Sequence, residues 1–254
     1  MIEQIFATKK FMTQAWDVNG KRLAITKCLI EDHIVIGKKK VKVKFADCFS
    51  SSSSKDCLIW EIGYGQKKLK NMSKPLRAIL EKLGLKNGVK KIQGMRDYDC
   101  QNQLISGSII NVFDFINLGD KVNVTGITKG RGFAGVVKRH GFSGGPRTHG
   151  QSDRLRAPGS IGGTISRVWK GQKMAGRYGN DNIAVKNLTV VYVNKDKREI
   201  WLSGPVPGHF NSIVTISKTN KKVEVKLNYV ASGIELANNV VDKKVNSEKK
   251  DIKK

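Results

Sequence analysis

The stretch KVNVTGIT, residues 121–128, runs directly into KGRGFAGVVKRHGFSGGPRTHG, residues 129–150, and the change between them decides the fold. In the first part apolar and polar residues alternate, which is typical of a β-strand with one buried face. The second part has no such period and is rich in glycine and basic residues. The sequence therefore predicts a strand that leads into a long irregular segment, which ends near residue 181.

This irregular segment, residues 129–181, has a composition of its own. It contains eleven Lys and Arg residues against two acids, Asp153 and Asp181, and 13 of the chain's 26 glycines. Only 14 of its 53 residues are hydrophobic, a smaller share than the 39% of the whole chain. So few apolar side chains cannot build a core that offsets the entropy lost on ordering. We expect the segment to take its shape from a partner.

The sequence on both sides of the segment predicts β-structure. Short apolar or alternating runs between turn residues are typical of strands, and they occur at residues 23–25, 34–36, 41–45, 58–62, 89–95, 108–115, 121–128, 183–193, 200–202, 213–216 and 223–225. One helix is expected over residues 73–84, because Ser73 can cap it, Pro75 suits its first turn and Gly84 suits its end. The serine tract 50–54 predicts a hairpin tip or a short insertion. These patterns indicate a mainly β fold.

The overall charge indicates a polyanionic partner. Lys and Arg number 47 against 21 Asp and Glu, which gives a formal net charge of +26. A membrane surface would require a basic amphipathic helix or a lipidation signal, and the sequence shows neither. Cys28, Cys48, Cys57 and Cys100 form no CxxC pair and the histidines no HExxH motif. We therefore expect no metal and no cofactor.

Arginine is concentrated in the irregular segment. Seven of the chain's eleven arginines lie there, whereas 32 of its 36 lysines lie elsewhere. The planar guanidinium binds phosphate through two hydrogen bonds and stacks on bases. Phe133, Phe142, Trp169 and Tyr178 are interleaved with these charges, and aromatic rings stack on unpaired bases. The pattern favours folded RNA over duplex DNA, although Phe133 and Phe142 fit equally well as residues that pin the segment to the β-domain.

A rival interpretation uses the same residues. GRGFAG, residues 130–135, matches the GxGxxG pattern of dinucleotide sites after a predicted strand and before a possible helix at 134–140. Such a site also needs a βαβ unit and an acidic residue at the end of its second strand, and Asp153 lies in no predicted strand. No Walker-type loop is present, since neither Gly20-Lys21 nor Gly37-Lys38 continues with Ser or Thr. Two alternatives stay open, a dinucleotide-dependent enzyme and a free DNA-binding protein.

Three blocks in order, at residues 121–150, RAPGSIG at 156–162 and VWKGQKMAGRYGN at 168–180, closely resemble the central signature of the universal large-subunit ribosomal protein L-three family, in its bacterial form. The resemblance extends outward to ATKKFMTQAWDVNG at 7–20, IGYGQKKLKNMSKPL at 62–76 and LSGPVPGHFNSIVTI at 202–216. It covers about residues 5–217.

The resemblance implies a closed six-stranded β-barrel of the translation-protein type. Its globular domain would comprise residues 1–128 and 182–230, with a small helical insertion near 73–84. Residues 129–181 would form an extended loop that penetrates ribosomal RNA (rRNA) toward the peptidyl-transferase centre. Residues 231–254 lie outside the resemblance, and their Lys-rich composition predicts a flexible tail. It also implies an organising role in early assembly of the large subunit, with rRNA and neighbouring large-subunit proteins as partners.

On this interpretation the protein is no enzyme, has no catalytic residue and takes no small-molecule substrate. It would lie in the ribosome in the cytoplasm, with an organellar ribosome as the alternative. The residues expected to bind rRNA are Lys129, Arg131, Lys138, Arg139, His140, Arg147, His149, Arg154, Arg156, Arg167, Trp169, Lys170, Lys173 and Arg177. The loop tip near the peptidyl-transferase centre would be Gly162, Gly163, Thr164, Ile165 and Ser166.

The tip departs from the family pattern. Between the GSIG block and the KG of the next block only Gly163 to Trp169 intervene, fewer residues than bacterial members usually have. Some bacterial members carry a methylated glutamine at the tip, and residues 163–166 contain none. We therefore expect a shorter tip without that modification.

Overall fold

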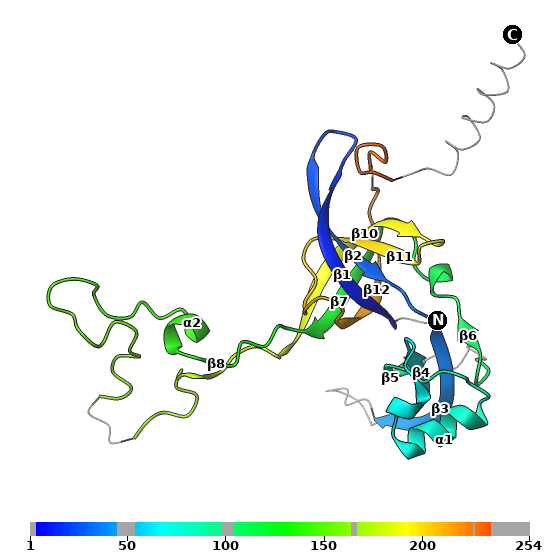
Figure 1. Ribbon diagram of the computed structural model, residues 1–254, viewed down its shortest axis with the longest axis horizontal. Coiled ribbons are helices and arrows are strands. Elements are labelled where there is room, and N and C mark those ends of the chain that lie inside the picture. The colour runs from blue at the N-terminus through cyan, green and yellow to red at the C-terminus, as the bar shows by residue number, and fades with distance from the viewer. Residues whose placement is uncertain (1–3, 45–53, 98–103, 164–166, 226, 235–254) are drawn as a thin grey trace, which may run out of the picture. The chain divides into compact units, whose positions relative to one another are not determined.

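The computed structural model describes residues 4–44, 54–97, 104–163, 167–225 and 227–234, and at 42–44, 54–57 and 96–97 the backbone alone. Its contacts divide the chain into two units. Unit 1 comprises Met1–Gly126 and Ala184–Lys254, and unit 2 comprises Ile127–Ile183. Figure 1 shows that strands dominate the ribbon. The prediction of a mainly β fold is confirmed.

Six strands form a ring in which each strand is hydrogen-bonded to the next and the last to the first. The order around the ring is β1-β12-β7-β10-β11-β2 (Figure 1). Burial alternates along β7, where Val122 and Val124 are fully buried, as the alternating sequence predicts. The strands are β1 (Gln4–Trp16), β2 (Arg22–Leu29), β7 (Asp120–Ile127), β10 (Asn182–Asn194), β11 (Glu199–Ser203) and β12 (Ile213–Lys222).

Unit 1 also contains a four-stranded sheet of order β5-β4-β3-β6. Its strands are β3 (His33–Lys44), β4 (Ser54–Tyr64), β5 (Lys91–Asp97) and β6 (Ile109–Ile110). β3 and β4 pair antiparallel out to Lys44 and Ser54. The serine tract predicted as a hairpin tip falls between these strands, and residues 50–53 of it lie outside the described residues.

One α-helix of unit 1, α1 (Lys74–Lys82), lies within the range predicted for a helix. Ser73 occupies the N-cap position without a side-chain capping bond, and Gly84 has a φ of +71° just past the end. Leu80 is its buried residue and packs with Ile36 and Val89 in a small core. A 3-10 turn, η1 (Leu69–Asn71), precedes the helix. None of the described helices is long and apolar enough to cross a membrane.

The N-terminal strand β1 has no counterpart among the predicted strands. Ile5, Phe6, Ala7 and Thr8 are all buried, so the first half of β1 shows no alternation. One hydrophobic core contains residues of β1 together with residues of the ring and of the four-stranded sheet, such as Val122 and Trp60. Because both faces of this strand are covered, the period of two that marks a half-buried strand is absent.

Two predicted strands are wrong in detail. The run 108–115 forms only β6 and then a 3-10 turn, η2 (Val112–Asp114), because β3 pairs with it at His33 and Ile34 alone. The run 223–225 is no strand, because β12 ends where its partner β7 begins, at the pair Lys222 and Asp120. Val225 instead packs against a second core.

The chain remains packed beyond β12. Leu227 and Ile234 are buried in the second core with Ala15, Ile25 and Trp201. The amide of Ile234 donates to the Tyr229 carbonyl oxygen at 2.9 Å. Packing therefore continues past residue 230, at which the predicted globular domain ended. Of the predicted tail, residues 235–254 lie outside the described residues.

A buried histidine joins β1 to β3. The imidazole of His33 is 2% exposed, and its Nε2 accepts the amide N–H of Phe6 at 2.9 Å. Its Nδ1 lies 3.0 Å from the Glu31 carbonyl oxygen, so Nδ1 carries the proton of the neutral ring. Burial lowers the pKa of His33 to about 4, although the Glu31 carbonyl and Asp32 act to raise it. A second proton, on Nε2, would break the bond to Phe6.

This arrangement predicts a pH dependence of stability. The pKa of His33 is about 4 when folded against an ordinary 6.5, so its contribution is fully present above pH 6.5 and is lost as the pH falls toward 4. The full effect is about 3 kcal/mol, at 1.36 kcal/mol per unit of pKa. Chemical unfolding of wild type and His33→Gln across this range measures it. If the free energy of unfolding changed equally with pH in the two proteins, the assignment of a neutral His33 ring would be contradicted.

Candidate nucleic-acid interface

Unit 2 begins with two chain segments joined by an antiparallel ladder, which we call the neck, residues 128–134 and 176–181. The amide of Thr128 donates to the Asp181 carbonyl, and the amide of Arg131 to the Tyr178 carbonyl, both at 2.9 Å. The Tyr178 amide donates to the Gly132 carbonyl at 2.9 Å. The ladder continues into β8 (Phe133–Ala134) and β9 (Gly176–Arg177). The ends of the irregular segment are therefore held together by backbone hydrogen bonds.

Glycine is required at one point of the neck. Gly179 has a φ of +78°, and a Cβ there would lie 2.2 Å from the Lys129 carbonyl oxygen. Asn180, next in sequence, also has a positive φ, of 62°. The second segment can bend this close to the first only because position 179 has no side chain.

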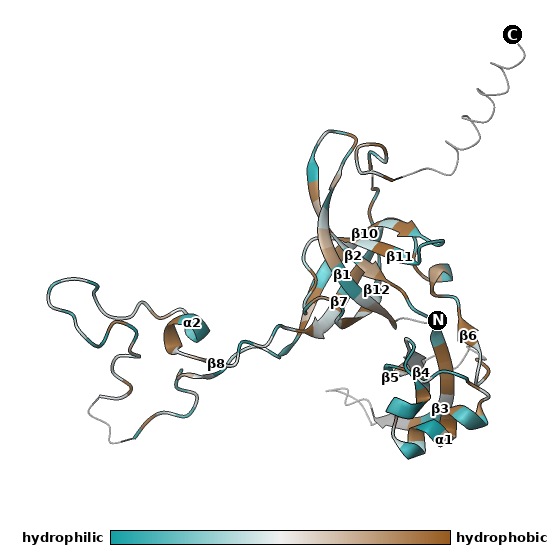
Figure 2. Ribbon diagram, viewed as in Figure 1, coloured by the Kyte–Doolittle hydropathy of each residue, from teal (hydrophilic) through white to brown (hydrophobic). Residues whose placement is uncertain are grey.

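Beyond β8 a single helical turn, α2 (Val136–His140), is fixed to the returning chain. The Arg139 guanidinium Nη1 donates to the Met174 carbonyl oxygen at 2.8 Å, and His140 Nε2 lies 3.1 Å from the same oxygen. Gly141 ends the turn with a φ of +73°. Ala134 and Val136 are the buried hydrophobic residues of the described part of unit 2. In Figure 2 α2 is partly brown and partly teal, and the rest of this segment shows short stretches of teal, white and brown.

A second backbone contact lies further along the segment. The amide of Gly145 donates to the Leu155 carbonyl at 3.0 Å. A Cβ on Gly144, whose φ is +77°, would lie 2.2 Å from the same oxygen. This contact brings the stretch before Arg147 next to the stretch that carries Arg154 and Arg156.

The cationic side chains of the segment face solvent. Of the fourteen residues predicted to bind rRNA, twelve are exposed, and Arg139 and His140 are half-buried. Within the described part of 127–183, no cationic group forms an ion pair with a carboxylate. Two of the cations lie over aromatic rings instead, Arg131 over Tyr178 at 5.7 Å and Arg167 over Trp169 at 5.5 Å. The charge of the segment is therefore free to meet an external polyanion.

The structure brings some of the predicted residues together and leaves others apart. Lys129, Arg131 and Arg177 share the neck, and Arg139 and His140 share the Met174 carbonyl. In the described structure no hydrogen bond links these two groups to the side chains of Arg147, His149, Arg154 or Arg156. Of the predicted tip, Gly162 and Gly163 are exposed, and Thr164, Ile165 and Ser166 lie outside the described residues.

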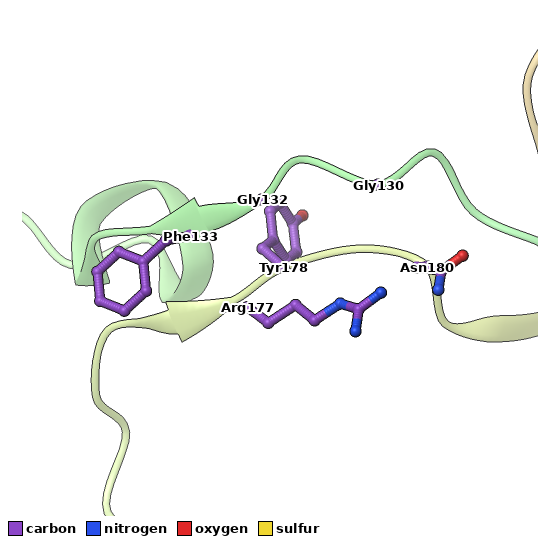
Figure 3. A pocket seen from close by; sticks show the side chains of 6 residues that line it. All are labelled: Gly130, Gly132, Phe133, Arg177, Tyr178 and Asn180. Atoms are coloured by element: carbon purple, nitrogen blue, oxygen red, sulfur yellow. The ribbon is translucent and has the colours of Figure 1, made fainter.

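Three neck residues were absent from the predicted site. Phe133, Tyr178 and Asn180 line an open pocket of about 620 Å³ together with Gly130, Gly132 and Arg177 (Figure 3). Phe133 is 81% exposed, so within unit 2 it packs into no core. Phe142 is half-buried and its ring lies 6.1 Å from that of His140. The aromatic interleaving in the sequence was the signal for Phe133 and Tyr178, and nothing in the sequence marked Asn180.

The GxGxxG match folds differently from a dinucleotide site. Gly132 has a φ of +65°, and the two residues that follow it form β8, which pairs antiparallel with β9. A dinucleotide site needs a parallel strand after its helix, and among the described residues α2 leads to none. No group of three or more His, Cys, Asp or Glu residues suited to a metal occurs in the described chain.

The neck geometry predicts unequal effects of two glycine substitutions. Gly179→Ala and Gly171→Ala both place alanine at a positive φ, which costs about 1 to 2 kcal/mol, but a Cβ at Gly171 meets nothing within 4 Å. We expect Gly179→Ala alone to open the ladder and to speed amide hydrogen exchange at Arg131 and Tyr178 by about tenfold or more. If Gly179→Ala left the exchange rates of both amides unchanged, the close contact between position 179 and the Lys129 carbonyl would not be what holds the neck closed.

Comparison with known proteins gives a consistent result. The family described as "Ribosomal protein L3" matches residues 16–200. The "Large ribosomal subunit protein uL3" of Herpetosiphon aurantiacus is 38% identical over 223 residues, which cover 87% of this chain and 98% of the relative. The protein of the same name from Chlorobium limicola is 40% identical over 208 residues, or 80% of this chain and 98% of the relative. Because the family match covers β2, β7 and β10 of the ring, the neck and the cationic segment, this chain belongs to the ribosomal protein L3 family.

Proposed function

We propose that this protein is a structural constituent of the large ribosomal subunit and binds rRNA through residues 129–181. The observation that carries the proposal is the set of exposed cations in this segment, which form no ion pair within its described part. Cations that are left unneutralised and are spread along an extended chain suit a folded polyanion, whose phosphates surround the chain. The relatives are named large ribosomal subunit proteins, which supports large-subunit rRNA as that polyanion.

The protein acts as a binding component of the cytoplasmic ribosome and not as an enzyme. Its partners are rRNA and neighbouring large-subunit proteins. The rRNA-binding residues are the fourteen predicted from the sequence, with Arg139 and His140 also serving to fix α2 to Met174. We assign the residues from Gly162 to Ser166 to the tip that approaches the peptidyl-transferase centre.

Unit 1 supplies the anchor of this assembly. The closed ring of six strands supports assignment to the translation-protein type of barrel, which has no open edge strands. We assign residues 1–128 and 182–230 to this barrel domain with its helical insertion and residues 129–181 to the rRNA-penetrating loop. The Lys-rich residues 231–254 form a C-terminal extension that has the packed Ile234 near its start, and residues 235–254 of it lie outside the described residues. A rigid anchor with an adaptable charged segment suits an organising role early in subunit assembly.

Sedimentation tests the assignment to the large subunit. The tagged full-length protein, expressed in its own cells, should migrate with the large subunit through a sucrose gradient and remain there at moderate salt. A protein that stays at the top of the gradient, or that migrates with DNA, would contradict the proposal.

Exchange of arginine for lysine tests whether charge alone explains binding. Replacement of the seven arginines of 129–181 by lysine keeps the net charge, so pure charge attraction predicts unchanged affinity for rRNA. Contacts through two hydrogen bonds and stacking predict a loss of about tenfold or more at equal salt. The same exchange at the four arginines outside the segment is the matched control and should have a smaller effect. Equal affinities in all three proteins would make arginine placement irrelevant.

A further inference from the structure

We propose that the pocket of the neck binds a single unpaired rRNA base, which stacks on Phe133 while Arg177 holds a flanking phosphate. This inference rests on the proposed function and adds to it which part of the rRNA one pocket binds. The pocket lies wholly within unit 2 and is lined by Gly130, Gly132, Phe133, Arg177, Tyr178 and Asn180 (Figure 3).

First, the aromatic ring of Phe133 is exposed although the backbone around it is held in place. Phe133 is 81% exposed although it lies in β8, whose partner β9 is held by backbone hydrogen bonds. Phe133 pairs with Arg177 across this ladder, so the two side chains leave it on the same side. Figure 3 shows the Phe133 ring at one end of the pocket, while the Arg177 side chain extends away from it toward Asn180. The pocket therefore offers a flat apolar surface at one end and a guanidinium fork further along, which are the two groups that an unstacked nucleotide with its flanking phosphate requires.

The second argument is the character of the remaining walls. Gly130 and Gly132 place bare backbone at the pocket, so a flat ring can approach the chain closely. Tyr178 forms a further wall, with Arg131 over its ring at 5.7 Å. The amide of Asn180 can both donate to and accept from a base edge.

Charge selects the occupant of the pocket. The walls are mainly apolar and contain no carboxylate, and the charged residue that lines them is the cation Arg177. A second cation, Arg131, lies over the ring of the lining residue Tyr178. An apolar side chain of a protein would fill the walls and leave both cations unused. A nucleotide fills the walls with its base and neutralises the cations with its phosphates.

The test uses full-length protein and the large-subunit rRNA of the same organism. Phe133→Leu keeps apolar bulk and removes the aromatic face, and Phe133→Tyr keeps the face. Because Phe133 is 81% exposed, neither change disturbs a core. Stacking on an aromatic side chain contributes about 1 to 3 kcal/mol per base, so Phe133→Leu should weaken binding by roughly 5- to 150-fold. Phe133→Tyr should bind as wild type does.

Phe210→Leu is the matched control, because Phe210 is 60% exposed, lies in unit 1 and also has a cation, Lys10, over its ring. It should lose less affinity than Phe133→Leu. Footprinting with reagents that modify the Watson–Crick edges of unpaired bases gives a second readout. At least one base should be protected by wild type and by Phe133→Tyr but modified in the Phe133→Leu complex, while backbone protection along the rest of the segment persists.

The outcomes separate this inference from the function on which it rests. Wild-type protein that binds no rRNA would overturn the proposed function. If wild type binds rRNA and Phe133→Leu binds it with the same affinity and the same footprint, the base pocket is overturned but the proposed function is not. A loss of affinity in Phe133→Leu with no base newly modified would also overturn it, because the ring would then pack on some other surface.

Discussion

A segment with eleven cations and few apolar residues cannot hold its shape by burying a core, so backbone hydrogen bonds fix its ends, and we expect a partner to fix the rest of its shape. The neck supplies them where the segment leaves β7 and returns to β10, between Thr128 and Asp181 and between Arg131 and Tyr178. Each of these bonds joins residues that are about fifty positions apart in the sequence, and together they fix where the charged loop begins and ends. The exposed cations and the base pocket both depend on this short ladder.

Glycine allows chain segments to approach closely at two points of residues 129–181, at Gly179 in the neck and at Gly144 beyond it. At Gly179 and Gly144 a Cβ would lie 2.2 Å from a carbonyl oxygen of the facing chain. The two facing segments of the chain can therefore approach closely through their backbones alone, and the nearby cationic side chains stay exposed to solvent. Few of the segment's cations take part in its internal structure. The clearest example of one that does is Arg139, whose guanidinium donates to the Met174 carbonyl oxygen. The segment thus uses backbone for structure and leaves most of its arginines exposed.

Much of this organisation is predictable from the sequence, because local patterns encode it. The alternation at Val122 and Val124 identified β7, and the glycine and arginine content identified the segment that follows. The strand β1 escaped prediction because Ile5 to Thr8 are buried on both faces and show no period of two. The neck and its pocket could not be predicted, because the pairing of Phe133 with Arg177 is a contact between residues far apart in the sequence and no local pattern indicates it.

The central claim is that the uncompensated cations of 129–181, and not the larger number of lysines elsewhere, bind rRNA. The salt dependence of rRNA affinity tests it most directly, measured for wild type, for a variant with the eleven Lys and Arg residues of the segment replaced by Gln, and for a control with eleven exposed lysines of unit 1 replaced by Gln. If about half of the segment's cations engage phosphates, the wild-type plot of log K against log salt should have a slope of roughly −4 to −5. The segment variant should lose most of this slope and the control little of it. A control that loses as much slope as the segment variant would contradict the claim.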